Sequence, residues 1–429
     1  MEGVMALLLK NMLLCDALRE RGEYASLLIE EGVISAILPA GEAPRCEEVV
    51  DGRGKMALIP GFVNAHTHAA MVLLRGLGED SPLKVWLETK IWPLEARLTR
   101  EHIYWGTKQA LLEMAAMGVT AFADMYFEMD AVVEAALETG VRIAPCRGIV
   151  GDGPEKLAEG LALADTWRDH KDFVSVQLGP HAPYTLSLPF LKEICAAGKD
   201  RNLGVHFHFL ETQDEIEYLR KNFGLSPAEY LEESGIASAP SALLAHCVWL
   251  DPATLDEADF SRTALVHNPN SNCKLGSGIM DLAGISAKMP RIALGTDGAA
   301  SNNRLDIWGE MRSAALLAKG TTGDPTAVPA RDVLRMATLE GAKALGFPRK
   351  GLIREGWAAD LVLVDLDTPS YVGVDEENVH GYLVYAGGAE DIAGTMVAGR
   401  WICREGEYPH ADREEILAKA KEMRKNLLQ

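Results

Sequence analysis

Residues 57–68 read Ala-Leu-Ile-Pro-Gly-Phe-Val-Asn-Ala-His-Thr-His, an apolar run of strand length that ends in two histidines. Successive side chains of a strand point to opposite faces, so His66 and His68 point the same way. Imidazoles that converge on one point are a common way to hold a divalent metal. The alternative is a polar turn after a strand, because a motif this short can arise by chance. The rest of the chain favours the metal site.

Downstream of this stretch, short apolar segments alternate with segments of helical length, a pattern typical of a parallel sheet with helical crossovers. The eight expected strands are Ile59–Ala65, Val119–Asp124, Val141–Arg147, Val174–Gly179, Gly204–Phe209, Ala242–His246, Ala264–His267 and Arg291–Thr296. The helices expected between them include Glu101–Met117, Ala131–Glu138, Pro154–Arg168, Leu188–Lys199 and Glu211–Lys221. Eight such units over roughly 290 residues predict an α/β fold, a (β/α)8 TIM barrel. A doubly wound sheet would need a glycine-rich phosphate turn after its first strand, and none is there.

Both ends of the chain differ from this middle part. Residues 1–58 contain short apolar segments and a hairpin turn at Glu31-Gly32. Similar short apolar segments return after residue 360. We therefore expect three parts: a small β-sandwich built from residues 1–58 plus 352–410, a metal-dependent catalytic barrel over 59–351, and a C-terminal helix within 411–429.

Composition narrows the class of partner and the compartment. The chain has 42 basic and 62 acidic residues, which gives a formal net charge of −20. A surface this acidic repels phosphate backbones and anionic lipids, so we expect neither nucleic acid nor a membrane as partner. Seven cysteines without a Cys-x-x-Cys pair indicate reduced thiols and a cytoplasmic protein. A homo-oligomer is compatible with this composition, which leaves the oligomeric state open.

Polar side chains collect where the expected strands end. In a (β/α)8 barrel these C-terminal ends form the face that carries active sites. Any one of these histidines could be a hydrogen-bonded interior residue, but together they indicate a metal. The residues at or just after the strand ends are His66, His68, Asp124, Arg147, His181, His208, Glu211, His246, His267 and Asp297.

The residue types at these ends suit one divalent ion, Zn²⁺ or Fe²⁺. The expected ligands are three imidazoles and one carboxylate: His66, His68, His208 and Asp297. A two-metal site would need a bridging carboxylate or carboxylated lysine, whereas the fourth strand ends in Gly-Pro-His181. A divalent ion lowers the pKa of water, His246 would orient that water, and Glu211 would carry protons. These residues predict metal-dependent hydrolysis without naming a substrate.

Other residues near this rim have simpler interpretations. His206 lies one layer deeper than His208, so we expect it to support a ligand or to fill the barrel interior. We expect Asp124 and His267 to support neighbouring loops. For Glu211 the alternative is an acidic residue favoured by a helix N-terminus.

Several motifs resemble the amidohydrolase superfamily, in particular its 5-methylthioadenosine/S-adenosylhomocysteine deaminases. They include Pro-Gly-Phe-Val-Asn-Ala-His-Thr-His at 60–68, His-Asn-Pro-Asn-Ser-Asn at 267–272 and Leu-Gly-Thr-Asp-Gly at 294–298. The similarity continues nearly to both ends of the chain. Further matching segments are 73–76, 124–127, 179–184, 208–212, 245–248, 273–276, 299–303, 355–362 and 396–400.

The resemblance implies a barrel joined to a β-sandwich, and a metal held by the four expected ligands. It implies that Glu211 handles the ring nitrogen of a purine during attack at C6, and that Asp297 takes part in proton transfer and in substrate binding. It also implies that Glu95 holds the ribose hydroxyls, that His181 lines the nucleoside pocket and that Arg147 meets the 5′ substituent.

The sequence departs from this family in the loop after the third expected strand. Family members that grip a carboxylate tail can carry a second arginine there, whereas residues 150–156 offer only Lys156. Lysine is a point charge rather than a bidentate fork. A neutral 5′ group, methylthio or hydroxyl, is therefore expected to be handled at least as well as the tail of S-adenosylhomocysteine.

The expected activity is conversion of 5′-methylthioadenosine, S-adenosylhomocysteine or adenosine to the inosine analogue and ammonia. A sister enzyme acting on guanine, a pterin or a triazine would keep the metal ligands without requiring Glu95 or Arg147. A barrel that had lost catalysis and served in assembly would have no reason to keep Glu211. A small zinc-dependent polynucleotide deaminase would need His-x-Glu and Pro-Cys-x-x-Cys elements, and the sequence has neither.

Overall fold

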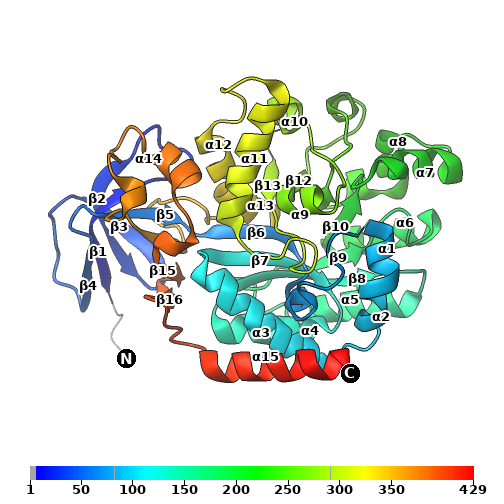
Figure 1. Ribbon diagram of the computed structural model, residues 1–429, viewed down its shortest axis with the longest axis horizontal. Coiled ribbons are helices and arrows are strands. Elements are labelled where there is room, and N and C mark those ends of the chain that lie inside the picture. Colours follow the sequence, from blue (N-terminus) through cyan, green and yellow to red (C-terminus); the bar gives the residue numbers. More distant parts are fainter. Residues whose placement is uncertain (1–5, 82, 290) are drawn as a thin grey trace.

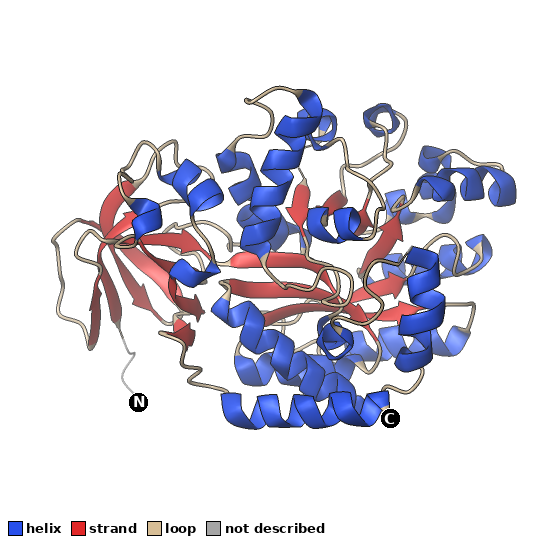
Figure 2. Cartoon of the chain, in the orientation of Figure 1, coloured by secondary structure: helices blue, strands red, loops and turns tan. Residues whose placement is uncertain are grey.

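A (β/α)8 barrel forms the body of the molecule (Figures 1 and 2). The computed structural model describes residues 6–81, 83–289 and 291–429, and within them eight parallel strands pair side by side in chain order. The expected fold class is confirmed. The barrel strands are β6 (Phe62–Thr67), β7 (Val119–Tyr126), β8 (Arg142–Ile149), β9 (Gln177–Pro180), β10 (Gly204–Phe209), β11 (Ala242–His246), β12 (Thr263–His267) and β13 (Ile292–Leu294).

Hydrogen bonds bring the first and last barrel strands together. The side chain of Asn64 on β6 accepts the backbone N–H of Thr296 at 3.0 Å and donates to its hydroxyl at 2.7 Å. One residue later, the backbone N–H of Asp297 donates to the carbonyl of His66 at 2.9 Å. Closure of the barrel therefore places Asp297 directly beside the N-terminal histidine pair.

The strand expected at 59–65 is two strands that belong to different sheets. β5 (Met56–Pro60) pairs with strands of the terminal sheet, and β6 begins at Phe62. Gly61 links them: its N–H donates to the carbonyl of Asp360 at 2.9 Å, and a Cβ atom there would lie 2.2 Å from Thr120. The apolar run continues through both strands, so the sequence pattern predicts a single strand.

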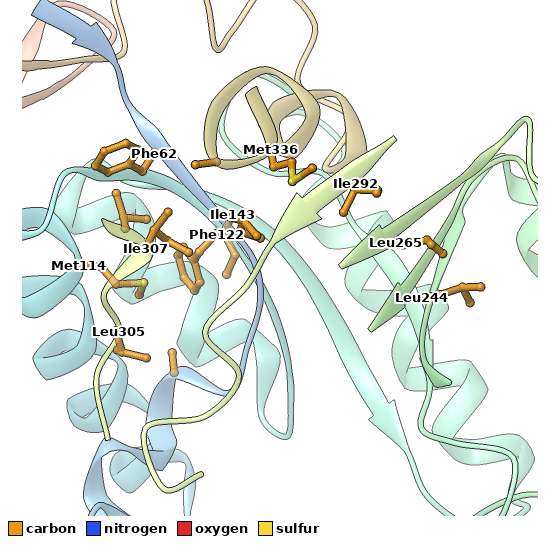
Figure 3. Packing of buried hydrophobic residues seen from close by; sticks show 14 of the residues in the cluster. Phe62, Met114, Phe122, Ile143, Leu244, Leu265, Ile292, Leu305, Ile307 and Met336 are labelled. Carbon is orange, nitrogen blue, oxygen red and sulfur yellow. The ribbon is translucent and has the colours of Figure 1, made fainter. Parts of the chain in front are cut away.

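Helices cover the outside of the barrel (Figure 1). Figure 3 shows the apolar layer between strands and helices, with Phe122 and Ile292 from strands and Ile307 from a helix. On β10 the residues Val205, Phe207 and Phe209 belong to this layer, so His206 and His208 face the barrel interior. The barrel helices include α3 (Arg100–Ala116), α4 (Met129–Thr139), α5 (Pro154–Thr166), α6 (Leu188–Arg201), α7 (Gln213–Phe223), α8 (Pro227–Ser234), α9 (Pro269–Lys274), α10 (Leu282–Lys288), α11 (Ile307–Thr322), α12 (Ala330–Arg335) and α13 (Gly341–Ala344).

A second sheet, drawn at the left of Figure 1, combines strands from both ends of the chain. Its order is β16-β15-β14-β5-β1-β2-β3, and β4 also pairs with β1. β4 and β5 pair with different parts of β1, on either side of the left-handed residue Asn11. The domain boundaries expected after residues 58, 351 and 410 stay predictions. The strands not yet given are β1 (Leu7–Leu14), β2 (Glu23–Glu30), β3 (Val33–Pro39), β4 (Glu48–Asp51), β14 (Leu361–Asp365), β15 (Ile392–Val397) and β16 (Arg400–Arg404).

Two contacts fasten the terminal segments to the barrel. Arg142 on β8 and Asp360, just before β14, form a buried bidentate ion pair at 2.7 and 2.9 Å. The C-terminal helix α15 (Arg413–Leu428) lies along α3 (Figure 1) and buries one face against it. The buried residues of α15 are Ile416, Ala420, Met423 and Leu427.

Two further observations bear on the environment of the chain. None of the described helices is both long enough and apolar enough to cross a bilayer. All seven cysteines are free thiols, and five of them are buried.

Candidate metal centre and active site

Three histidines meet at the C-terminal end of the barrel strands. His66 and His68 come from the end of β6, and His208 comes from β10. The ring centroid of His66 lies 4.9 Å from that of His68 and 4.8 Å from that of His208. One nitrogen of each ring lies within 4.8 Å of the other two, close enough for the three to share one ion. The structure thus brings together the three imidazoles expected as ligands.

Asp297 and His246 join this group. Oδ1 of Asp297 lies 3.5 Å from Nε2 of His66 and 3.2 Å from Nε2 of His68. His66, His246 and Asp297 also offer ligand atoms within 4.8 Å of one another. His246 and Asp297 both have a left-handed backbone, with φ of 73° and 60°. Such a conformation costs of order 1–3 kcal/mol in a non-glycine residue and is found most often at functional sites.

The hydrogen bonds of the outer ring nitrogens leave the inner nitrogens available for a metal. Nδ1 of His66 lies 2.8 Å from Nε2 of His206, and Nδ1 of His68 donates to the carbonyl of Met125 at 2.6 Å. Nδ1 of His208 donates likewise to a backbone carbonyl at 2.8 Å. Within the part of the chain that the structure describes, Nε2 of His66 is buried without a hydrogen-bond partner. These donors fit a divalent ion, because such outer contacts orient metal-binding imidazoles.

Burial and nearby charges set the protonation states of the group. Burial and the neighbouring imidazoles hold the pKa of His208 well below its ordinary value, so the ring is neutral and able to bind a metal. Burial raises the pKa of Asp297, but the nearby imidazoles of His66 and His68 outweigh it and keep this pKa well below the usual range. At His68 burial lowers the pKa, and the Asp297 carboxylate outweighs it and raises the pKa to about 9. A bound cation would therefore displace a proton from His68.

Two serines that the sequence analysis did not single out hold Asp297 in place. The hydroxyls of Ser271 and Ser301 donate to Oδ2 of Asp297 at 2.7 and 2.8 Å. The backbone N–H of Gly298 donates to Oδ1 at 2.8 Å. The serines occupy Oδ2, so Oδ1 is the oxygen that faces the histidines. Both serines lie within matched motifs, which was the available signal for them.

Glu211 lies in the loop between β10 and α7, because the helix expected to begin at this residue begins at Gln213. The carboxylate of Glu215 accepts the backbone N–H groups of residues 210–212 at 3.0, 2.8 and 3.2 Å and so fixes the loop. The side chain of Glu211 accepts a hydrogen bond from Ser277 at 3.1 Å. Burial raises the pKa of Glu211, which suits a group that holds and releases a proton.

His246 is oriented by Asn272, another residue that the sequence analysis did not single out. Nδ1 of His246 lies 2.8 Å from Oδ1 of Asn272 and donates to it. This leaves Nε2 of His246 facing the site, 4.0 Å from Oε2 of Glu211. The ring can therefore hold a small polar group between itself and Glu211.

A cavity of about 640 Å³ opens over these groups, a volume suited to a small organic molecule. His181 lines the cavity, with its ring centroid 4.6 Å from that of His208. Glu95 also lines it and accepts a hydrogen bond from the hydroxyl of Tyr126 at 2.7 Å. The residues that line the cavity also include His68, Trp86, Ile91, Val150, Glu211, His246 and Asp297.

Arg147 does not line this cavity. Its Nε donates to Glu159 at 2.6 Å, and it borders a separate cavity of about 240 Å³. Side chains alternate along β8, so Arg147 points towards α5 while Gly148 lines the larger cavity. The ammonium of Lys156 donates to the carbonyl of Val150. Among the described residues, no lysine or arginine lines the larger cavity.

The three residues expected to have supporting roles lie beneath or beside the metal centre. His206 contacts His66 as described above, and it is fully buried. One carboxylate oxygen of Asp124 accepts the backbone N–H of Ala69 at 2.6 Å, directly after His68. His267 is buried at the end of β12. The contacts of His206 and Asp124 are those of residues that orient the histidine pair.

Comparison with known proteins places the chain in a family. The model of the amidohydrolase family matches residues 57–402. This chain belongs to the amidohydrolase family. The match includes the whole barrel and most of the terminal strands after residue 56, and it confirms the family indicated by the motifs.

Curated relatives within the family are similar over nearly their whole length. The 5-methylthioadenosine/S-adenosylhomocysteine deaminase of Moorella thermoacetica is 42% identical over 400 residues, which cover 91% of this chain and 92% of the relative. The protein of the same name from Dictyoglomus thermophilum is 40% identical over 392 residues, covering 90% and 91%.

Solved structures of amidohydrolases share the fold. An adenosine deaminase from Xanthomonas campestris with bound zinc superposes with a TM-score of 0.92 at 32% identity, covering 98% of both chains. Atrazine chlorohydrolase from Arthrobacter aurescens in complex with zinc gives a TM-score of 0.88 at 25% identity, covering 97% of this chain and 100% of the other. Together with the converging donors, these likenesses indicate a metal site without identifying the metal. The roles of individual residues stay predictions.

Proposed function

We propose that this amidohydrolase is a metal-dependent deaminase of adenosine-type nucleosides. Its reaction would convert 5′-methylthioadenosine, S-adenosylhomocysteine or adenosine to the corresponding inosine and ammonia. The free thiols support a reducing compartment, and we place the enzyme in the cytoplasm.

One observation carries the proposal. Three imidazole nitrogens and Oδ1 of Asp297 converge at the inner end of a nucleoside-sized cavity, with Glu211 and His246 beside them. Relatives named for deamination of adenosine derivatives, at about 40% identity over nine-tenths of the chain, support the choice of substrate.

The residues at the inner end suit the proton movements of this reaction. Glu211 gives a proton to N1 of the purine while the oxygen of water bonds to C6, and Asp297 accepts the proton that the water loses. His246 orients the water through Nε2. Asp297 then protonates the C6 amino group, which leaves as ammonia as the C6–N bond breaks, and Glu211 takes the hydroxyl proton as the carbonyl forms.

A single metal completes this arrangement. The residues that would hold it are His66, His68, His208 and Asp297. When bound, a divalent ion supplies Lewis acidity and lowers the pKa of water to about 7. We propose Zn²⁺, with Fe²⁺ as the alternative, because both accept imidazole and carboxylate donors. Zinc in the structure of the Xanthomonas campestris enzyme supports this choice.

Ultraviolet spectroscopy tests the function. Incubation with the three nucleosides should convert the adenine spectrum to that of hypoxanthine and release one ammonia per nucleoside. Removal of the metal with a chelator should abolish the change, and added Zn²⁺ should restore it. Unchanged spectra across the nucleosides, with metal bound to the protein, would reject the proposed substrates.

The cavity also predicts a preference among 5′ substituents. Arg147 is paired with Glu159 outside the cavity, and the Lys156 ammonium is bonded to a backbone carbonyl. Among the described residues that line the cavity, a carboxylate tail would therefore find no lysine or arginine, and we expect kcat/KM for 5′-methylthioadenosine to equal or exceed that for S-adenosylhomocysteine. The exposed cavity residue Val150 offers a matched variant, since Val150→Arg should shift the ratio towards S-adenosylhomocysteine. A strong wild-type preference for S-adenosylhomocysteine would contradict the prediction.

The alternative function is deamination of guanine, a pterin or a triazine. It is less well supported. Atrazine chlorohydrolase shares the fold at lower identity than the curated nucleoside deaminases. A free base or a triazine has no ribose hydroxyl to donate to the oxygen of Glu95 that Tyr126 does not occupy. Turnover of guanine or of a triazine in preference to nucleosides would favour this alternative.

A further inference from the structure

A short helical segment covers one side of the cavity. It comprises α1 (Leu83–Trp86), the single π-turn η2 (Leu87–Ile91) and α2 (Trp92–Glu95). Figure 1 draws α1 and α2 beside the barrel, near β8 and β9. Trp86 and Ile91 are buried, and both line the cavity. The segment therefore forms a wall of the proposed nucleoside site, although it lies outside the barrel strands.

One side-chain hydrogen bond ties the end of this segment to the barrel. The hydroxyl of Tyr126, the last residue of β7, donates to Oε1 of Glu95 at 2.7 Å. Tyr126 is only 4% exposed, and burial raises the pKa of its hydroxyl well above the ordinary value, so it remains a donor. Throughout the described residues, this is the one hydrogen bond made by the Glu95 side chain.

The aromatic ring of Tyr126 connects Glu95 with the metal centre. Its centroid lies 6.1 Å from that of His68, and its neighbour Met125 accepts the Nδ1 hydrogen of His68. A phenol ring is rigid, so the distance between the Glu95 carboxylate and His68 is fixed by consecutive residues of one strand. A ligand that contacts both the Glu95 carboxylate and the groups around His68 is then held in a set position.

The hydrogen bond from Tyr126 gives the two carboxylate oxygens of Glu95 different roles. Tyr126 occupies Oε1, which leaves Oε2 free to accept hydrogen bonds from a ligand in the cavity. Burial raises the pKa of Glu95, and the hydrogen bond from Tyr126 acts against that rise. The tyrosine thus favours the ionised carboxylate, the form that accepts hydrogen bonds from hydroxyl groups.

We infer that Tyr126 is a positioning residue that aims Glu95 at the ribose hydroxyls and so makes the enzyme selective for ribosides. This inference rests on the proposed function. It assigns a role to a residue of the 124–127 motif that the deamination steps above do not use. Phenylalanine at this position would keep the ring and its packing, while Glu95 would lose its only described partner and its fixed direction.

Paired substrates test the inference in the metal-loaded enzyme. For Tyr126→Phe we expect kcat/KM for adenosine to fall about tenfold, mainly through KM, because a charge-assisted hydrogen bond is lost. For 2′,3′-dideoxyadenosine, which lacks the 2′ and 3′ hydroxyls, the same variant should behave like the wild type. Glu95→Gln should reduce discrimination between the two nucleosides, and Tyr126→Phe added to it should cause little further loss.

Each outcome has a distinct meaning. A purely structural role of Tyr126 would lower turnover of both nucleosides equally, and that result would overturn the inference while leaving the proposed function intact. Unchanged kinetics of Tyr126→Phe on both nucleosides would overturn it in the same way. A wild type that is inactive on every adenosine nucleoside would reject the proposed function, and the inference with it. Thermal unfolding of each variant separates a loss of fold from a loss of ribose binding.

Discussion

Replacing Asp297 by alanine is expected to lower kcat by more than about 10³, because the variant loses a proton acceptor and a metal donor together. Oδ1 of Asp297 lies 3.5 and 3.2 Å from the inner nitrogens of His66 and His68. Without this oxygen, one side of the proposed metal site has no carboxylate. The zinc affinity, measured by competition with a chromophoric chelator, should fall together with turnover measured by ultraviolet absorbance.

Two further variants separate these contributions. Asp297→Asn keeps the shape of the side chain and an oxygen for the serine hydroxyls, so it should lose turnover with a smaller loss of zinc affinity. Asp259→Ala, which removes an exposed carboxylate on the loop before β12, should change neither quantity. Wild-type turnover and zinc affinity in Asp297→Ala would exclude Asp297 from the site.

The grouping of the histidines inside the barrel could be predicted from the alternation of side chains along each strand. The period of a strand fixes which side chains share a face, so His206 and His208 could be placed inside the barrel from β10 alone. The approach of Asp297 to His66 depends on barrel closure between distant strands. It could still be expected, because the ends of parallel barrel strands meet at one face whatever their separation in sequence.

Other features depended on contacts that the sequence does not encode locally. The apolar run at 57–66 does not reveal that Gly61 divides it between two sheets, since both strands are buried and read alike. Arg147 follows strand alternation away from the cavity, where Glu159 neutralises it. Its place at a strand end therefore identified the residue but not the direction of its side chain.

The residues that orient the site could not be predicted from their residue types either. Ser271 and Asn272 contact Asp297 and His246 from α9, and Glu215 holds the backbone around Glu211. Serine, asparagine and glutamate are common near helix ends for capping reasons, so their presence there points to no chemistry. Their function becomes evident only once the distances to the site are known.

Glu211→Gln is expected to lower kcat by about 10²–10⁴, the usual contribution of a positioned proton carrier. An amide occupies nearly the same volume and can still accept a hydrogen bond from Ser277, yet it cannot give a proton to N1 of the purine. The bound zinc per protein, measured by elemental analysis, should not change, because Glu211 is not among the proposed ligands.

In Glu211→Gln, thermal stability should be kept or increased although turnover falls. Burial raises the pKa of Glu211, which means that the folded protein disfavours its charge. A neutral glutamine removes that cost, so the melting temperature of Glu211→Gln should equal or exceed that of the wild type. Glu217→Gln, an exposed change on α7, provides the matched control and should keep full activity. Wild-type turnover by Glu211→Gln would show that another group carries the proton, whereas a lower melting temperature with lost zinc would assign Glu211 to the scaffold instead.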